Sequence, residues 1–368
     1  MIPSHVTAMG VAVTTGAAAF VLVAVLTEAT RAFALRHGIV DRPAATRPHR
    51  RPTPYLGGVA LVAGTLLPPV VAIGGWTLQV AMIMAGGVLV AVIGAADDLR
   101  PLHPAVRLLT EGAVAAAVVA AGVRLHLLEA VVPFGGWLDA VLTTAWIVFV
   151  TNVFNMIDNT DGVLGSITIT TAGTLAAAAY LTGRPDVALL AFSLAVGCLG
   201  FVAHNWAPAR IFMGDAGSLY IGFTLAACAV TAFQGAAPAT ALPALLLITF
   251  VPTVDTCLAV VARRRARRSW LVASPDHLAH RLVAAGFAPR QIALVLSAAA
   301  TVTSLLALHL TLGRIPGPLA LAGVLGAGAG LVALLLRAPG RYPSPPPRPP
   351  TRDDREPRPA TVPLEERH

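Results

Sequence analysis

Residues 138–162 read LDAVLTTAWIVFVTNVFNMIDNTDG, an apolar run whose far end is crowded with amides and carboxylates. A helix needs about 20 mostly apolar residues to cross the hydrocarbon core of a membrane. The polar side chains at the end of this run are Asn152, Asn155, Asp158, Asn159 and Asp161. The stretch therefore predicts a membrane-spanning helix that delivers oxygen-rich side chains to one side of the membrane.

The rest of the chain repeats this pattern. It has 368 residues, only 12% of them charged, and a mean hydropathy of +0.74. Long apolar runs recur from residue 9 to residue 337, which predicts an all-α integral membrane protein that crosses the bilayer many times. We expect about eleven transmembrane helices, at residues 9–33, 56–75, 77–96, 105–122, 138–157, 162–182, 186–204, 216–234, 238–262, 290–312 and 315–336.

The arginines divide unevenly between the loops of this eleven-helix arrangement. One side receives Arg36, Arg42, Arg47, Arg50, Arg51, Arg263, Arg264, Arg265, Arg267 and Arg268. The other side receives Arg124, Arg184 and Arg314. Because basic residues favour the cytoplasmic side, we expect an outside N-terminus, a cytoplasmic C-terminus and location in the cytoplasmic (inner) membrane. The net charge of +8 then indicates contact with lipid headgroups and no nucleic-acid partner.

The chain divides into two parts by composition. Residues 1–337 hold the apolar runs and form the expected transmembrane domain. Residues 338–368 are rich in proline and arginine and poor in apolar side chains. That composition predicts a disordered cytoplasmic tail.

Polar residues at the ends of different predicted helices, and in the loop after the ninth predicted helix, fall on one membrane face. They are Asp97, Asp98, Asn152, Asn155, Asp158, Asp161, Asn205, Asp215, His277, His280 and Arg281. An isolated carboxylate at a helix end is usually a hydrated cap. The span count did not use these residues, so their agreement on the cytoplasmic face favours a functional site.

The chemistry of this set points to a magnesium site. Carboxylates are hard oxygen ligands, and Mg²⁺ is commonly held by one or two of them together with substrate phosphates and water. Asp215 lies between Gly214 and Gly217 at the start of a predicted helix, where free N–H groups attract anions. Mg²⁺, arginine and phosphate together indicate phosphoryl transfer, with one water-soluble and one lipid-borne substrate.

Six stretches together resemble a known family, the polyprenyl-phosphate N-acetylhexosamine-1-phosphate transferases. They are RPHRRPTPYLGG from residue 47, DDLRPLHPAVRLL from 97, NVFNMIDNTDG from 152, NWAPARIFMGDAGSLYIGF from 205, PTVDT from 252 and DHLAHRL from 276. The resemblance implies transfer of a sugar-1-phosphate from a UDP-sugar to a polyprenyl phosphate. The products would be a polyprenyl-diphospho-sugar and UMP, and the metal would be Mg²⁺ or Mn²⁺.

The resemblance also assigns roles around the metal. Asp97 and Asp98 match catalytic carboxylates, one of which would activate the lipid phosphate. Asp215 matches a metal ligand. The residues expected to line the nucleotide and metal site are Asn152, Asn155, Asp158 and Asp161, with Asp158 and Asp161 also catalytic candidates and Asp158 a second metal ligand. A phosphomonoester is largely dianionic at neutral pH, so alignment and charge neutralisation outweigh proton removal.

Further residues are expected to bind the substrates. His277, His280 and Arg281 match a loop near the phosphates of the sugar nucleotide. Arg107 stands where many relatives have lysine. The remaining candidates are Arg47 and His49 for the lipid phosphate, Asn205, and Asp255. For Asp255 a structural ion pair with an arginine is an equal alternative.

Several alternatives stay open at this stage. UDP-N-acetylglucosamine is the expected donor, and UDP-N-acetylmuramoyl-pentapeptide is the alternative. A membrane transporter would also have many spans and embedded carboxylates, although transporter sites usually lie near the bilayer midplane. An inactive relative that binds the lipid carrier is a third candidate. The oligomeric state is open, a homodimer included.

Overall fold

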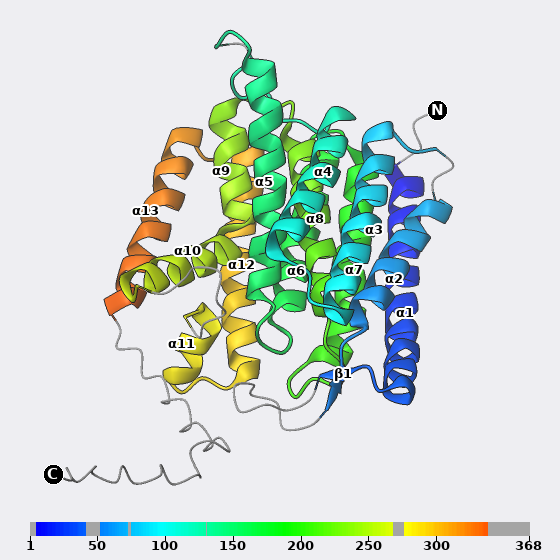
Figure 1. Ribbon diagram of the computed structural model, residues 1–368. Coiled ribbons are helices and arrows are strands. Elements are labelled where there is room, and N and C mark those ends of the chain that lie inside the picture. The colour runs from blue at the N-terminus through cyan, green and yellow to red at the C-terminus, as the bar shows by residue number, and fades with distance from the viewer. Residues whose placement is uncertain (1–4, 42–51, 73–74, 130, 268–275, 338–368) are drawn as a thin grey trace, which may run out of the picture.

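The structure is a bundle of helices with one very small sheet (Figure 1). It is a computed structural model that describes residues 5–41, 52–72, 75–129, 131–267 and 276–337. The elements are α1 (His5–His37), β1 (Val40–Asp41), β2 (Thr53–Pro54), α2 (Gly57–Ala72), α3 (Leu78–Leu99), α4 (Pro104–Ala120), α5 (Gly135–Ile157), α6 (Val163–Leu181), α7 (Pro185–Asn205), α8 (Gly214–Phe233), α9 (Pro238–Ile248), α10 (Phe250–Arg265), α11 (Leu278–Ala284), α12 (Pro289–Thr311) and α13 (Gly317–Arg337).

Eight of these helices are long and apolar enough to cross a membrane. They are α1, α3, α5, α6, α7, α8, α12 and α13. The predicted class, an all-α protein with many membrane spans, is therefore confirmed. Every one of the eleven predicted ranges contains a helix. Among the described residues, α2 and α4 do not meet the criteria of length and apolar composition that the eight helices meet. The count of eleven spans therefore stays a prediction.

The ninth predicted helix is wrong as a single straight span. Residues 238–262 form two helices, α9 and α10, which meet at Thr249 with a bend of 72°. Pro252 explains the break, because it has no N–H to donate to the carbonyl of Ile248, where α9 ends. The short helix α11 and the pairing of β1 with β2 were also not predicted.

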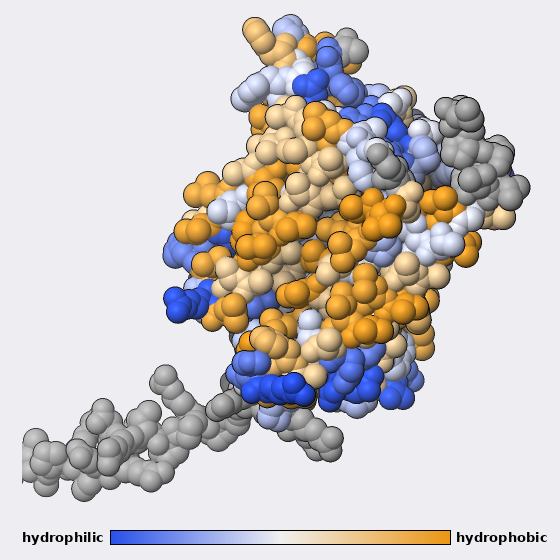
Figure 2. Space-filling model, turned by 90° about the vertical axis from the view of Figure 1, so that its right-hand side faces the viewer, coloured by the Kyte–Doolittle hydropathy of each residue, from blue (hydrophilic) through white to orange (hydrophobic). Residues whose placement is uncertain are grey.

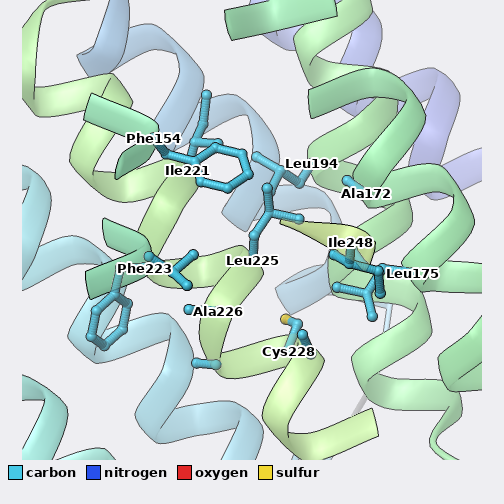
Figure 3. Packing of buried hydrophobic residues seen from close by; sticks show 14 of the residues in the cluster. Phe154, Ala172, Leu175, Leu194, Ile221, Phe223, Leu225, Ala226, Cys228 and Ile248 are labelled. Carbon is cyan, nitrogen blue, oxygen red and sulfur yellow. The ribbon is translucent and has the colours of Figure 1, made fainter. Parts of the chain in front are cut away.

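Helix α8 forms the centre of the bundle. Every residue from Ala216 to Phe233 is buried, and α8 contacts helices that include α2, α3, α5 and α6. Figure 3 shows Ile221, Phe223 and Leu225 of α8 among side chains from the surrounding helices. Because protein rather than lipid encloses α8, the polar start of this helix can be held in a fixed position.

Small residues allow backbones to approach α8 closely. A Cβ on Gly58 of α2 would lie 2.2 Å from the backbone nitrogen of Gly217. A Cβ on Gly94 of α3 would lie 2.5 Å from the backbone of Asp215. Close backbone contact is how helices associate where lipid is as apolar as the side chains. The same contacts bring the end of α3 against the start of α8.

The outer surface has the pattern of a membrane protein. In Figure 2 a broad apolar band lies between hydrophilic residues at the two ends of the molecule. Exposed apolar side chains on α1 and α2 include Val21, Val25 and Leu67. Such residues are stable facing lipid, where exposure carries no hydrophobic penalty. Helix α1 begins at the top of Figure 1, whereas β1 and α11 lie at the bottom.

The close contact between α1 and α2 is testable at Gly64. A Cβ at this residue would lie 2.4 Å from a methyl carbon of Val23 and 2.8 Å from its backbone nitrogen. We expect Gly64→Ala to cost about 1–3 kcal/mol through overpacking, visible as a lower Tm in detergent. Gly323→Ala in α13, where a Cβ has nothing within 4 Å, is the control and should leave Tm unchanged or slightly raised. Equal Tm values for both variants would contradict this packing.

Candidate active site

Asp98, near the end of α3, holds the first turn of α8. Its Oδ1 accepts from the backbone N–H of Asp215 at 2.9 Å, and its Oδ2 accepts from that of Ala216 at 3.2 Å. Gly214 adopts a φ of +71°, and a Cβ there would lie 2.6 Å from Asp98 Oδ2. A carboxylate at a helix N-terminus satisfies free N–H groups and interacts favourably with the helix dipole. Asp98 therefore fixes the position of Asp215.

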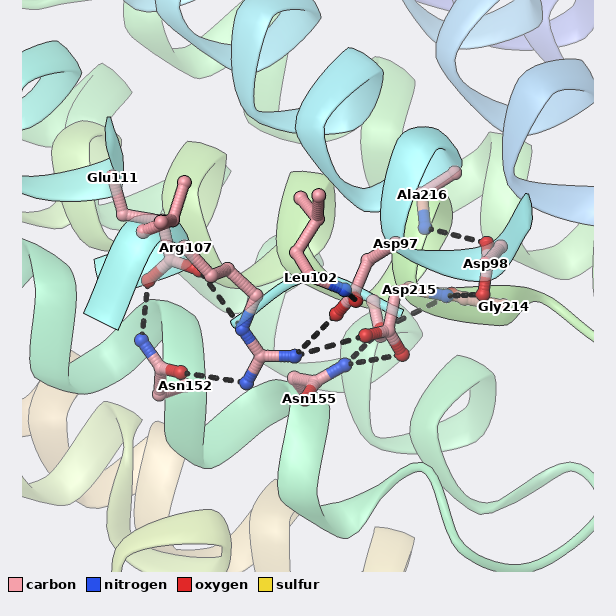
Figure 4. Close-up of polar contacts among 12 residues, drawn as sticks. Asp97, Asp98, Leu102, Arg107, Glu111, Asn152, Asn155, Gly214, Asp215 and Ala216 are labelled. Carbon is pink, nitrogen blue, oxygen red and sulfur yellow. Dashed lines mark hydrogen bonds and ion pairs between the residues drawn. The ribbon is translucent and has the colours of Figure 1, made fainter. Parts of the chain in front are cut away.

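Arg107, on α4, connects the acidic side chains of several helices (Figure 4). Its Nη1 lies 3.0 Å from Asp97 Oδ2 and 3.0 Å from Asp215 Oδ2. Its Nε lies 3.6 Å from Glu111 Oε1, and its Nη2 donates to Asn152 Oδ1 at 3.3 Å. One guanidinium thus bridges carboxylates from α3, α4 and α8. Because a guanidinium carries five N–H donors in a fixed plane, it suits this multiple role better than an ammonium.

The amides of α5 complete the cluster. Asn155 Nδ2 donates to Asp215 Oδ1 at 3.0 Å and to Ser218 Oγ at 2.9 Å. Asn152 Nδ2 donates to Glu111 Oε2. The two asparagines are three residues apart, so they lie on the same face of α5. They join the end of the predicted membrane helix to the carboxylates, and Figure 4 shows both pointing toward Arg107 and Asp215.

Glu111 belongs to this cluster although its side chain was not predicted as a site residue. It is buried, and its partners are Arg107 and Asn152. The sequence contained one indication, since Glu111 follows Arg107 by four residues and such pairs face each other on a helix. The need of a buried carboxylate for a charged or hydrogen-bonding partner explains better than this spacing why Glu111 lies beside Arg107 and Asn152.

Asp158 adds negative charge just beyond the end of α5. Burial, together with the nearby charges of Asp215, Asp98 and Asp161, raises the pKa of Asp158 to about 7. The direction means that the carboxylate is harder to ionise here than in water. A cation placed among these side chains would relieve the repulsion and keep Asp158 ionised.

The donor chemistry suits Mg²⁺, although the carboxylates do not form a closed metal site. Among the described residues, no three His, Cys, Asp or Glu side chains converge as a metal cluster would. Mg²⁺ is often bound by one or two carboxylates together with substrate phosphates and water. Asp215 and Asp158 are the two candidates, and Arg107 already contacts one oxygen of Asp215.

Asn205 and Asp161 tie together the loops beside the cluster. Asn205 Oδ1 accepts from the N–H of Gly162, and its Nδ2 donates to the carbonyl of Ile211, both at 2.9 Å. Asp161 Oδ2 accepts from the N–H of Ala209 at 2.9 Å. The amide of Asn205 is buried, and both its oxygen and its nitrogen are hydrogen-bonded to the backbone. Asn205 therefore connects two loops and does not contact a substrate.

Four further predicted residues lie on or next to α10 and α11: Asp255 on α10, His277 directly before α11, and His280 and Arg281 within α11. Asp255 is buried and bonds to His277 rather than to an arginine partner of the kind anticipated. Arg281 Nη1 donates to the carbonyl of Leu335 in α13 at 2.6 Å. Burial lowers the pKa of His280, which favours the neutral form of the ring. Arg47 and His49 lie outside the described residues.

The two groups of residues lie on either side of the end of α5. The hydroxyl of Thr256 on α10 lies 3.9 Å from the sulfur of Met156 on α5. Thr256 follows Asp255, and Met156 lies between Asn155 and Asp158. Helices α4, α8 and α10 all contact α5, whose end carries the first residues of the stretch NVFNMIDNTDG.

Comparisons with known proteins agree on one group. Residues 80–233 match the model of the family described as glycosyl transferase family 4. The chain is 37% identical to a Streptomyces coelicolor protein named "Putative glycosyltransferase", over 88% of this chain and 76% of that protein. It is 30% identical to the "Probable undecaprenyl-phosphate N-acetylglucosaminyl 1-phosphate transferase" of Bacillus subtilis, over 74% and 78%. It is 34% identical to the decaprenyl-phosphate N-acetylglucosaminephosphotransferase of Mycolicibacterium smegmatis, over 72% and 74%.

The bridging role of Arg107 can be tested by stability. Arg107→Met leaves Asp97, Glu111 and Asp215 without their shared cation, so we expect a loss of about 2–4 kcal/mol and a clearly lower Tm in detergent. Arg124→Met is the matched control, because Arg124 pairs at 3.7 Å with the exposed Glu129. That change should cost less than about 1 kcal/mol. Similar Tm values for Arg107→Met and the wild type would show that the bridge is dispensable.

Proposed function

The chain belongs to glycosyl transferase family 4, and we propose that it transfers N-acetylglucosamine-1-phosphate from UDP-N-acetylglucosamine to a polyprenyl phosphate in cell-envelope glycan synthesis. The names of its relatives support both the lipid acceptor and the sugar phosphate.

An oxygen of the lipid phosphate attacks the sugar-linked phosphorus of the donor. The bond from that phosphorus to the bridging oxygen breaks, and UMP leaves with that oxygen. The observation that carries the proposal is the acidic cluster joined by Arg107 at the end of a membrane helix.

We propose that Asp215 and Asp158 hold a Mg²⁺ ion against the donor diphosphate. When bound, Mg²⁺ would neutralise charge on the diphosphate and on the leaving UMP. Asn155 keeps one oxygen of Asp215 in place, and Asp98 fixes the backbone on which Asp215 is carried. This preorganisation aligns the reacting phosphates, which is the larger part of catalysis when little covalent chemistry falls to the protein.

The hydrogen bonds of Asp97 and Asp98 favour alignment over proton removal. Both oxygens of Asp98 accept backbone N–H groups. Asp97 accepts from the N–H of Leu102 and from Arg107. The lipid phosphate is largely dianionic at neutral pH, since its second pKa is about 6. We therefore infer that neither carboxylate is needed as a general base.

We propose that the site faces the cytoplasm. The distribution of arginine in the loops supports an outside N-terminus and a cytoplasmic C-terminus in the inner membrane. Eleven crossings would result if α2, α4 and the bent pair α9–α10 each cross once. A cytoplasmic site would give the water-soluble UDP-sugar direct access while the polyprenyl phosphate arrives from the bilayer.

The reaction can be tested with purified protein, labelled UDP-N-acetylglucosamine and polyprenyl phosphate. We expect a labelled lipid product and an equal amount of UMP, loss of both on addition of EDTA, and recovery with excess Mg²⁺ or Mn²⁺. UDP-N-acetylmuramoyl-pentapeptide in a parallel reaction tests the alternative donor and should give no product. Absence of a metal-dependent lipid product with every UDP-N-acetylhexosamine would contradict the enzymatic function and favour a transporter or an inactive carrier-binding protein.

Asp98→Asn tests the positioning role of Asp98. An amide places an N–H group opposite a backbone donor of α8, so Asp215 shifts and we expect kcat to fall at least 100-fold. Asp186→Asn, at the start of α7, is the control and should retain wild-type kcat. Because Asp98 acts through alignment, the residual activity should keep the wild-type dependence on pH. A rate close to wild type from pH 6 to 9 would exclude an essential role, and an altered pH profile would indicate a general base.

A further inference from the structure

A buried group of three side chains joins α10 to α11. Asp255 of α10 is fully buried, and its Oδ2 lies 2.7 Å from Nδ1 of His277. Its Oδ1 accepts from the backbone N–H of Leu278 at 2.6 Å. On the other side of the ring, Nη2 of Arg263 lies 3.3 Å from Nε2 of His277. We call Asp255, His277 and Arg263 the latch.

The partners of His277 determine where its proton lies. An ionised carboxylate only accepts hydrogen bonds, so Nδ1 must carry the proton that faces Asp255. A guanidinium only donates, so Nε2 must present a lone pair to Arg263. These partners fit the Nδ1–H tautomer of the ring, with both nitrogens in use. In this arrangement His277 has no hydrogen-bonding capacity left for a substrate phosphate.

His280 is in the opposite situation. It lies in α11, three residues after His277, which directly precedes that helix, and 6.2 Å separates the ring centroids. Its Nδ1 is buried and has no hydrogen-bond partner among the residues that the structure describes. A polar atom of this kind costs free energy until something pairs with it. The two histidines therefore differ in their hydrogen bonds: both ring nitrogens of His277 have partners, whereas Nδ1 of His280 has none among the described residues.

Helix α11 needs external support to keep its position. It has seven residues, and helices of that length are unstable alone in water. Its first N–H bonds to Asp255, and Arg281 in its last turn bonds to the carbonyl of Leu335. Because the latch fixes the beginning of α11, it also fixes where His280 lies relative to α10.

We propose that the latch is a positioning device, in which Asp255, Arg263 and His277 hold α11 so that His280, and not His277, meets the diphosphate of the donor. This assignment rests on the proposed function for the identity of the donor. It replaces the expectation that His277 and Asp255 bind substrate themselves. The latch residues act through α11, so they are positioning residues rather than catalytic ones.

The structural part of the proposal is tested by hydrogen exchange. We expect Asp255→Asn to raise amide exchange at least tenfold in the peptide 276–284, because an amide cannot accept from both His277 and Leu278. Asp139→Asn is the matched control, since Asp139 is also fully buried and accepts the backbone N–H groups of Leu128 and Glu129. It should leave the exchange of 276–284 unchanged. Unchanged exchange in Asp255→Asn would overturn the latch.

The kinetic part compares two substitutions of His277. Glutamine has one donor group and one acceptor group, as the neutral imidazole does, and can keep both latch contacts. We expect His277→Gln to stay within threefold of wild-type kcat/KM. We expect His277→Ala and Asp255→Asn to raise the KM for UDP-N-acetylglucosamine at least tenfold with a smaller change in kcat, while Asp139→Asn keeps the wild-type KM.

The outcomes separate the latch from the proposed function. If His277→Gln is as impaired as His277→Ala at equal Tm, the imidazole itself serves the reaction and the proposal is overturned. A wild-type KM in His277→Ala would also overturn it. If the wild-type protein makes no lipid product, the proposed function fails, and hydrogen exchange alone still decides whether the latch exists.

Discussion

The contacts of Arg107 with Asp97, Glu111 and Asp215 are the constraint on which the site depends. These carboxylates come from three helices, and without a shared cation they would repel one another where water is scarce. The guanidinium makes their proximity tolerable and sets the distances between α3, α4 and α8. The close backbone contacts of Gly58 and Gly94 then bring the helices near enough for those bonds to form.

The acidic cluster and the latch have separate roles in the proposed reaction. Asp98 and Asn155 hold Asp215 at the start of the enclosed helix α8, where we propose that the metal ion and the donor phosphates bind. On the other side of the α5 terminus, the bend between α9 and α10 directs Asp255 toward α11. In both the acidic cluster and the latch, buried charged groups are paired with hydrogen-bonding partners that fix their geometry.

The sequence predicted the helices well because a lipid-length apolar run is a local property. It also predicted that Asp98, Asn155 and Asp215 share one end of the bundle, because counting the membrane spans is enough to assign each helix end to one face of the membrane. It did not predict the break at Thr249, although Pro252 was visible. The partners of Asp255 and the place of Glu111 depend on contacts between distant segments, which one sequence without structure does not contain.

If the carboxylates joined by Arg107 form the proposed donor site, binding of the donor depends on a divalent cation. Calorimetric titration of the purified protein with UDP-N-acetylglucosamine, without lipid acceptor, measures this dependence before any turnover. We expect binding at least tenfold tighter in Mg²⁺ than in EDTA, and loss of that difference in Asp215→Asn. Equal affinity in Mg²⁺ and EDTA for the wild-type protein would contradict it.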